Sequence, residues 1–101
     1  MPVVIVDRDL KPIMPRFFEL QRQGLDELAR AVAEGNAETA RLVGHRMKGT
    51  GTSYGFPGLT DSGAAIENAA QKGDLAEAGR LGRAVAEFLD GVTVVYEEMP
   101  L

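Results

Sequence analysis

Three short, glycine-containing junctions divide this chain into four segments, and they constrain its fold more than any other feature. Gly35-Asn36 and Gly73-Asp74 each place a glycine where one helix would end and a capping side chain where the next would begin. The third junction, Ser53 to Gly58, is dense in glycine and proline, and Pro57 suits the first position of a helix. Connections this short cannot place consecutive helices in parallel, so we expect antiparallel neighbours.

Apolar residues recur at helical spacing in each of the four segments. The predicted helices begin at about Pro12 or Pro15 and run to 34, then span 37–54, 57–72 and 75–96. They predict an all-α fold, an antiparallel up-down four-helix bundle. The predicted core stripes are Phe18, Leu25, Leu28 and Val32; Ala40, Val43, Met47, Thr50 or Gly51, and Tyr54; Leu59, Gly63, Ile66 and Ala70; and Ala78, Leu81, Val85, Phe88, Val92 and Val95.

The two ends of the chain carry β-branched segments that do not match the helical pattern. Residues 1–11 form a short N-terminal extension, in which we expect Val3 to Val6 to be extended and packed on the bundle. The segment from Val92 to Tyr96 would favour a strand by propensity. Since no partner strand is evident for it, we expect this segment to complete the fourth helix.

Length and composition set the class of protein. The 101 residues fit a single domain, 1–101. The net charge of −4 and the lack of a long basic run argue against nucleic acid as a partner. The apolar run Val3 to Val6 is too short to span a membrane or to form the core of a signal peptide. Cysteine is absent, which excludes disulfides and thiolate sites, and we expect a cytoplasmic protein.

The only histidine, His45, lies in the middle of the second predicted helix. It is about 200° around the helix from Val43 and Met47, nearly opposite the core stripe, so its ring should be exposed to water. Arg41 and Lys48 lie one turn to either side, and Gly49 at i+4 has no side chain. The pattern therefore predicts an exposed nucleophile beside two cations and a bare patch of backbone.

Three glycines, Gly44, Gly49 and Gly51, fall inside this helix. Each should destabilise it by roughly 1 kcal/mol relative to alanine. Close packing against another helix could explain Gly44 and Gly51. Gly49 is on the solvent face beside His45, where the close approach of another molecule explains it better.

The motif His45-Arg46-Met47-Lys48-Gly49 is followed by Ser53-Tyr54-Gly55-Phe56, Leu59, Ile66 to Ala70 and Lys72-Gly73-Asp74. This pattern resembles the histidine-phosphotransfer (HPt) domain of bacterial phosphorelays, over roughly residues 17–88. The resemblance implies a four-helix bundle and a phosphocarrier that is not itself an enzyme. It implies that His45 accepts a phosphoryl group, that Lys48 supports it and that Gly49 leaves room for the partner.

The resemblance also implies the partners. A response-regulator receiver domain and a histidine kinase or hybrid kinase would exchange phosphoryl groups with His45. The partner receiver would supply Mg²⁺ and most of the catalysis, so we expect no cofactor in this chain. Arg41 is a second candidate to support the phosphoryl group, and Leu42 and Thr52 are candidates for the partner interface.

Simpler interpretations remain for these residues. Arg41 and Lys48 could be plain solvated cations, and Leu42 could lie at the edge of the core. The sequence contains no metal-binding cluster, and no base or orienting group is evident near His45. The scattered acidic residues are interpreted as solvated faces: Glu19, Asp26, Glu27, Asp61, Glu67 and Glu77.

Two other functions compete with the phosphorelay intermediate. One is the phosphoacceptor domain of a kinase, although an acidic residue usually follows the histidine there and Arg46 follows it here. That domain would also need an ATP-binding module, which 101 residues cannot hold. The other is a helical adaptor without phosphoryl chemistry.

Overall fold

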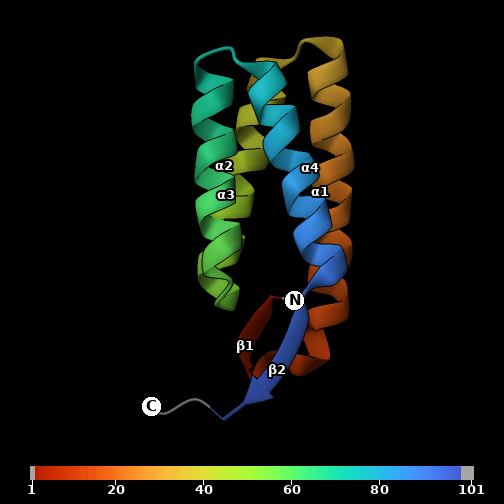
Figure 1. Cartoon of the computed structure of the whole chain (residues 1–101), viewed down its shortest axis with the longest axis vertical. Coiled ribbons are helices and arrows are strands. Elements are labelled where there is room, and N and C mark those ends of the chain that lie inside the picture. Colours follow the sequence, from red (N-terminus) through yellow and green to blue (C-terminus); the bar gives the residue numbers. More distant parts are fainter. Residues whose placement is uncertain (1, 99–101) are drawn as a thin grey trace.

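Four helices run side by side along the long axis of the molecule, with two short strands at one end (Figure 1). A computed structural model describes residues 2–98. The elements in chain order are β1 (Val3–Asp7), a 3₁₀ helix η1 (Arg8–Ile13), α1 (Met14–Glu34), α2 (Ala37–Tyr54), α3 (Pro57–Gln71), α4 (Leu75–Gly91) and β2 (Thr93–Glu97). The predicted all-α antiparallel four-helix bundle is confirmed. No helix in the described part of the chain is both long and apolar enough to cross a membrane.

The turns between helices use the capping chemistry that the sequence predicts. Gly35 and Gly73 adopt left-handed backbone with φ of 71° and 76°, which glycine tolerates without steric cost. The side chain of Asn36 accepts a hydrogen bond from the Thr39 amide at the start of α2. Asp74 caps α4 in the same way. These caps explain why α2 and α4 begin where the sequence predicts.

Helices α2 and α3 approach each other closely because glycines line their contact. A Cβ atom placed on Gly44 would lie 2.5 Å from the Glu67 amide nitrogen and 2.8 Å from the Gly63 carbonyl oxygen. A Cβ on Gly51 would lie 2.5 Å from the Thr60 amide nitrogen. The prediction that close packing explains Gly44 and Gly51 is therefore confirmed. This contact brings Glu67 of α3 next to the middle of α2.

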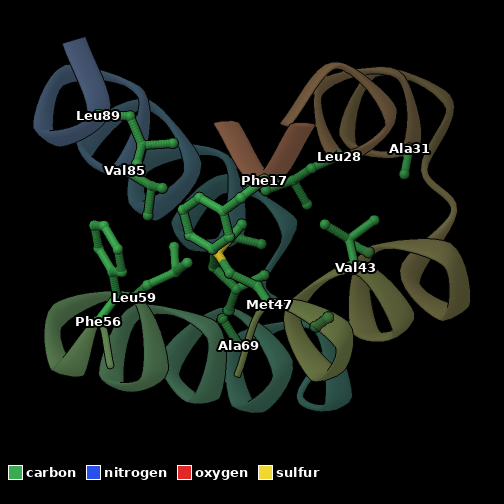
Figure 2. Close-up of a cluster of buried hydrophobic side chains, with 14 of the residues drawn as sticks. Phe17, Leu28, Ala31, Val43, Met47, Phe56, Leu59, Ala69, Val85 and Leu89 are labelled. Atoms are coloured by element: carbon green, nitrogen blue, oxygen red, sulfur yellow. The ribbon is translucent and has the colours of Figure 1, made fainter. Parts of the chain in front are cut away.

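The core lies between the four helices, and Phe17 occupies its centre (Figure 2). Phe17 is 2% exposed, and its ring packs against the rings of Tyr54 and Phe56 at centroid distances of 4.7 and 4.9 Å. The sequence predicted Phe18 in the stripe of the first helix, but Phe18 is only partly buried. The predicted stripe of α3 is confirmed, since all four of its residues are buried: Leu59, Gly63, Ile66 and Ala70.

The terminal segments pair with each other, which corrects the prediction for the end of the fourth helix. That helix ends at Gly91, and the backbone of Val92 is extended. Strand β2 lies parallel to β1, with Val3 opposite Thr93 and Val6 opposite Tyr96. The prediction of helix up to Tyr96 is wrong because this β-branched segment has a partner strand at the other end of the chain.

The two faces of this small sheet differ in burial. Val6 is 1% exposed and joins the core, which confirms that the N-terminal segment is extended and packs on the bundle. Val3 and Ile5 are on the opposite face, because successive side chains alternate along a strand, and they are 60% and 47% exposed. Val95, which the sequence assigned to the core stripe of the fourth helix, is also exposed.

Candidate functional site

His45 lies in the middle of α2, and its side chain is 60% exposed. The prediction of an exposed ring is confirmed. The ring does not extend freely into water, however, because it leans towards α3. Its Nδ1 atom lies 2.9 Å from the Oε2 atom of Glu67. The histidine is therefore accessible from outside while one edge of its ring is held by a carboxylate.

Glu67 contacts both His45 and Lys48, and the sequence did not predict it as a residue of this site. It was interpreted as part of a solvated face, but it is 9% exposed and lies at the closely packed contact between α2 and α3. The expectation that no orienting group lies near His45 is wrong for the same reason. A signal was present in the sequence: Glu67 follows Gly63 by one turn and adjoins the buried Ile66, so it borders the stripe that faces α2.

Lys48 holds the other oxygen of the Glu67 carboxylate. Its Nζ atom donates a hydrogen bond to Oε1 over 2.9 Å, and its side chain is 40% exposed. This hydrogen bond from Lys48 is the main reason that the pKa of Glu67 lies below its ordinary value, and the hydrogen bond from His45 adds to it. Burial by itself would raise the pKa of Glu67, but the hydrogen bonds and nearby positive charges outweigh this effect. Glu67 is therefore ionised at neutral pH and can only accept hydrogen bonds.

Arg41 lies near the same cluster but is held mainly by a neighbour on its own helix. Its guanidinium donates to both carboxylate oxygens of Glu38, over 2.7 and 3.1 Å, and this contact lowers the pKa of Glu38. The Nη1 atom of Arg41 also lies 3.9 Å from Oε2 of Glu67. The two candidate cations, Arg41 and Lys48, thus both approach the carboxylate that holds His45.

The three candidate interface residues lie in different surroundings. Leu42 is 42% exposed, so the alternative that placed it at the edge of the core is wrong. A Cβ on Gly49 would meet nothing within 4 Å, so packing does not require a glycine there. Thr52 is exposed, but its hydroxyl donates to the Lys48 carbonyl and lies 3.3 Å from the Thr60 hydroxyl. Leu42 and Gly49 therefore form open surface beside His45, while Thr52 is tied to α3.

Arg46, the residue after His45, marks the opposite flank of α2. Its Nη2 atom donates to Glu27 of α1 over 2.8 Å. His45 therefore lies between a flank that contacts α3 through Lys48 and a flank that contacts α1 through Arg46. Within residues 2–98, no three His, Cys, Asp or Glu side chains are grouped so that they could hold a metal ion.

Comparison with known proteins gave one match. The family model described as Hpt domain matches residues 13–93, which include all four helices and the whole of the His45 cluster. Searches of curated proteins and of solved structures found no match.

Proposed function

The chain belongs to the Hpt-domain family, and on that premise we propose that His45 is the residue that carries the phosphoryl group. Hpt domains are phosphocarriers that take part in phosphorelays. The proposed donor is an aspartyl phosphate on a receiver domain, or a histidine kinase or hybrid kinase. The proposed acceptor is the receiver domain of a response regulator.

The contact between His45 and Glu67 carries this proposal. Because the ionised carboxylate of Glu67 can only accept, the Nδ1 atom 2.9 Å away must carry the ring proton. The Nε2 atom on the other edge of the ring then has an unprotonated lone pair. With the side chain 60% exposed, a partner protein can bring a phosphoryl group to that atom. A solvated histidine without a role would not need this buried carboxylate.

The proposed transfer is a displacement at phosphorus. The Nε2 lone pair of His45 attacks the phosphorus of the receiver's aspartyl phosphate, and the N–P bond forms as the P–O bond to the aspartate breaks. The electron pair of that bond leaves with the aspartate carboxylate. The ring gains positive charge, which the carboxylate of Glu67 stabilises across the Nδ1 hydrogen bond. The reverse steps pass the phosphoryl group to the next receiver.

Lys48 and Arg41 have supporting roles in this proposal. An ammonium group has three hydrogen-bond donors, so Lys48 can keep its contact with Glu67 and also donate to a phosphoryl oxygen. Arg41, 3.9 Å from Glu67, adds a second positive charge near the phosphorylated ring. We expect Mg²⁺ to be bound by the partner receiver, which also provides most of the catalysis, and we expect this chain to need no cofactor.

A labelling experiment tests the proposal. The chain is incubated with phosphoramidate, a small phosphodonor, and separately with phosphorylated receiver domains encoded in the same genome. We expect wild type to take up an acid-labile, alkali-stable label and His45→Gln to take up none. His45→Gln should fold normally, within about 0.5 kcal/mol of wild type, because the site is exposed.

The control substitutes the neighbouring position on the same helix. Arg46→Gln should still take up label from phosphoramidate, since the Arg46 side chain pairs with Glu27 on the opposite flank from Glu67. Persistent label in His45→Gln would place the acceptor elsewhere. No label in wild type from any donor would favour a helical adaptor without phosphoryl chemistry.

A further inference from the structure

The terminal sheet has two strands, and one edge of β1 is left uncovered by the part of the chain that the structure describes. In Figure 1, β2 lies between β1 and the first turns of α1, and no helix or strand of residues 2–98 lies on the other side of β1. The side chains of Val3 and Ile5 on this strand are exposed. A two-stranded sheet is marginally stable by itself, and further strands stabilise it. The free edge of β1 is therefore a place where another strand can add.

The register of the sheet shows which backbone groups lie on this free edge. The Thr93 amide donates to the Pro2 carbonyl over 2.9 Å, and Val3 lies opposite Thr93. In a parallel pair with this register, the amide and carbonyl of Val4 face β2, while those of Val3 and Ile5 face away from it. The outward groups of Val3 and Ile5 have no backbone hydrogen bond with the rest of residues 2–98. The edge thus offers unpaired donors and acceptors at every second residue.

Strand β1 also lacks devices that usually protect an edge strand, such as charged side chains, bulges and covering segments. Residues 3–6 are Val-Val-Ile-Val, and they pair with β2 in a continuous register without a bulge. Strand β2 differs, because Glu97 and Glu98 place two negative charges at its end. Lys11 of η1 also lies over the Tyr96 ring of β2, 5.3 Å from its centroid. The β1 edge is therefore more open to pairing than the β2 edge.

A second copy of β1 matches this edge. When the second copy runs antiparallel and the two-fold axis passes through Ile5, each Ile5 lies opposite the other and Val3 lies opposite Asp7. Antiparallel strands form hydrogen-bonded pairs at every second residue, which is the spacing of the outward groups of Val3 and Ile5. The two copies of Asp7 are then about 14 Å apart, which is longer than the Debye length of about 8 Å at physiological ionic strength. The pairing therefore satisfies backbone groups without bringing like charges together.

The direction of the strands leaves room for the second bundle. Both strands run away from the helices along the long axis of the molecule (Figure 1), so the helices of an antiparallel copy lie beyond the opposite end of the sheet. The strand order becomes β2-β1-β1-β2, and the particle is longer than the 43 Å of one copy. His45 precedes Tyr54, at the end of α2 near the sheet, by nine residues or about 14 Å of helix. Both His45 side chains therefore stay accessible.

The size of the contact sets its strength. Strand β1 has five residues. At about 3.4 Å per residue and a sheet thickness of about 10 Å, its edge buries roughly 200 Å² on each copy. A standard interface buries about 800 Å² per partner, so this contact belongs with weak and transient ones. We expect a Kd of about 0.1–1 mM.

We propose that this protein self-associates weakly through the β1 edge, by two-fold antiparallel pairing around Ile5 into a four-stranded sheet. Backbone hydrogen bonds provide most of the contact, and the exposed side chains of the two Ile5 residues pack beside each other. The dimer presents two accessible His45 side chains on one particle. The pairing itself does not depend on the phosphoryl chemistry of His45.

Opposite charges at position 5 test the two-fold pairing. Sedimentation equilibrium of wild type between about 10 µM and 1 mM should show monomer and dimer in exchange. Ile5→Lys and Ile5→Glu should each weaken association at least about tenfold, because like charges directly opposite each other on neighbouring strands repel. An equimolar mixture of the two variants should associate again, because the two-fold axis places position 5 of one variant opposite position 5 of the other.

Val95 provides the matched control. It is exposed on the same face of the sheet and lies opposite Ile5, but its backbone groups face β1 and not the free edge. Val95→Lys and Val95→Glu should associate with a Kd within about threefold of wild type, and mixing them should change nothing. Far-UV circular dichroism should show the same helix content in all four variants, since both positions are exposed.

A measurement on wild type does not depend on any variant. In the proposed register, Val4 lies opposite Val6 of the second copy in a non-hydrogen-bonded pair, in which the two Hα atoms approach each other. Isotope-filtered NMR of mixed labelled and unlabelled protein at about 1 mM should therefore detect an intermolecular NOE between these Hα atoms.

Several results would overturn the proposal. Wild type that is monomeric up to about 1 mM, or a mixture of the Ile5 variants that stays monomeric, would exclude the pairing. An equal loss of association in the Val95 variants would place the contact on the exposed face of the sheet. Species larger than a dimer would replace two-fold pairing with open-ended association. Phosphoramidate should label His45 equally in all variants, and a lack of label in wild type would overturn the proposed function and not this proposal.

Discussion

Two alanine substitutions in the same helix, Gly44→Ala and Gly49→Ala, should have opposite effects on stability. Gly49 has open space around it, and an added Cβ would meet no atom within 4 Å. Gly44 faces α3, and an added Cβ would lie 2.5 Å from the Glu67 amide nitrogen. The chemical change is the same in both cases, so the difference between the variants isolates the contact between the helices.

The magnitudes follow from helix propensity and from the distances. Gly49→Ala should stabilise the protein by about 1 kcal/mol, which raises Tm by roughly 5 °C in a domain of this size. Gly44→Ala has the same propensity gain, but its Cβ must move about 1 Å away from backbone atoms to reach an ordinary contact distance. Overpacking of this kind costs about 1–3 kcal/mol, and the cost should be at the upper end because backbone cannot rotate aside. The net effect is a destabilisation of about 1–2 kcal/mol and a fall in Tm of roughly 5–10 °C.

Gly44→Ala should also impair phosphoryl uptake, because the atom it displaces belongs to Glu67. The Glu67 carboxylate lies 2.9 Å from Nδ1 of His45, and a shift of about 1 Å in its backbone would break that contact. We therefore expect slower labelling of Gly44→Ala by phosphoramidate. Gly49→Ala leaves α3 in place and should be labelled at the wild-type rate.

Thermal unfolding followed by far-UV circular dichroism, at one pH and ionic strength, measures the first effect. Labelling rates at a temperature where all variants are folded measure the second. A Gly44→Ala protein at least as stable as wild type would refute the reasoning about the helix contact. Lower stability with an unchanged labelling rate would refute the link from Gly44 through Glu67 to His45.

Other substitutions test separate parts of the structure. Glu67→Gln should slow phosphoramidate labelling of His45 about tenfold to a hundredfold. In this variant, ¹⁵N NMR of His45 should show a mixture of ring tautomers in place of one. An unchanged tautomer would contradict the role of Glu67 in holding the proton on Nδ1 of His45. The lowered pKa of Glu67 means that its ionised form stabilises the folded protein above the ordinary pKa of glutamate, and that this stabilisation is lost as the pH falls through the folded-state pKa. Urea unfolding should therefore show that the difference in free energy of unfolding between wild type and Glu67→Gln becomes smaller in acid. Val6→Ala should lower the free energy of unfolding by about 1–2 kcal/mol and Ile5→Ala by much less, which urea titration would measure; equal effects would contradict the assignment of the buried face. Gly49→Leu should slow transfer from a receiver but not labelling by phosphoramidate, and equal receiver rates would show that the bare patch has no part in docking.

The helices and the exposure of His45 could be predicted from the sequence, because they depend on residues close together in the chain. Asn36 and Asp74 cap the helices that follow them, and left-handed glycines end the helices before them. The helical period alone places His45 nearly opposite Val43 and Met47, and the ring is indeed exposed. The packing role of Gly44 was also foreseen, since glycines inside a helix indicate a close approach.

Only the tertiary structure decided which distant segments meet. The strand pairing of residues 93–97 depends on a partner at the other end of the chain, so local propensity could not establish it. The groove between α1 and α2, lined by Gly24, Val43 and Arg46 among others, likewise depends on how these two helices pack. Glu67 resembles any other acidic residue in the sequence, and its role depends on the packing of α3 against α2, which brings it to His45 and Lys48. Helical periodicity determines the face of a helix, but the register between two helices is set by side-chain packing across their contact, and that packing places the carboxylate beside the imidazole.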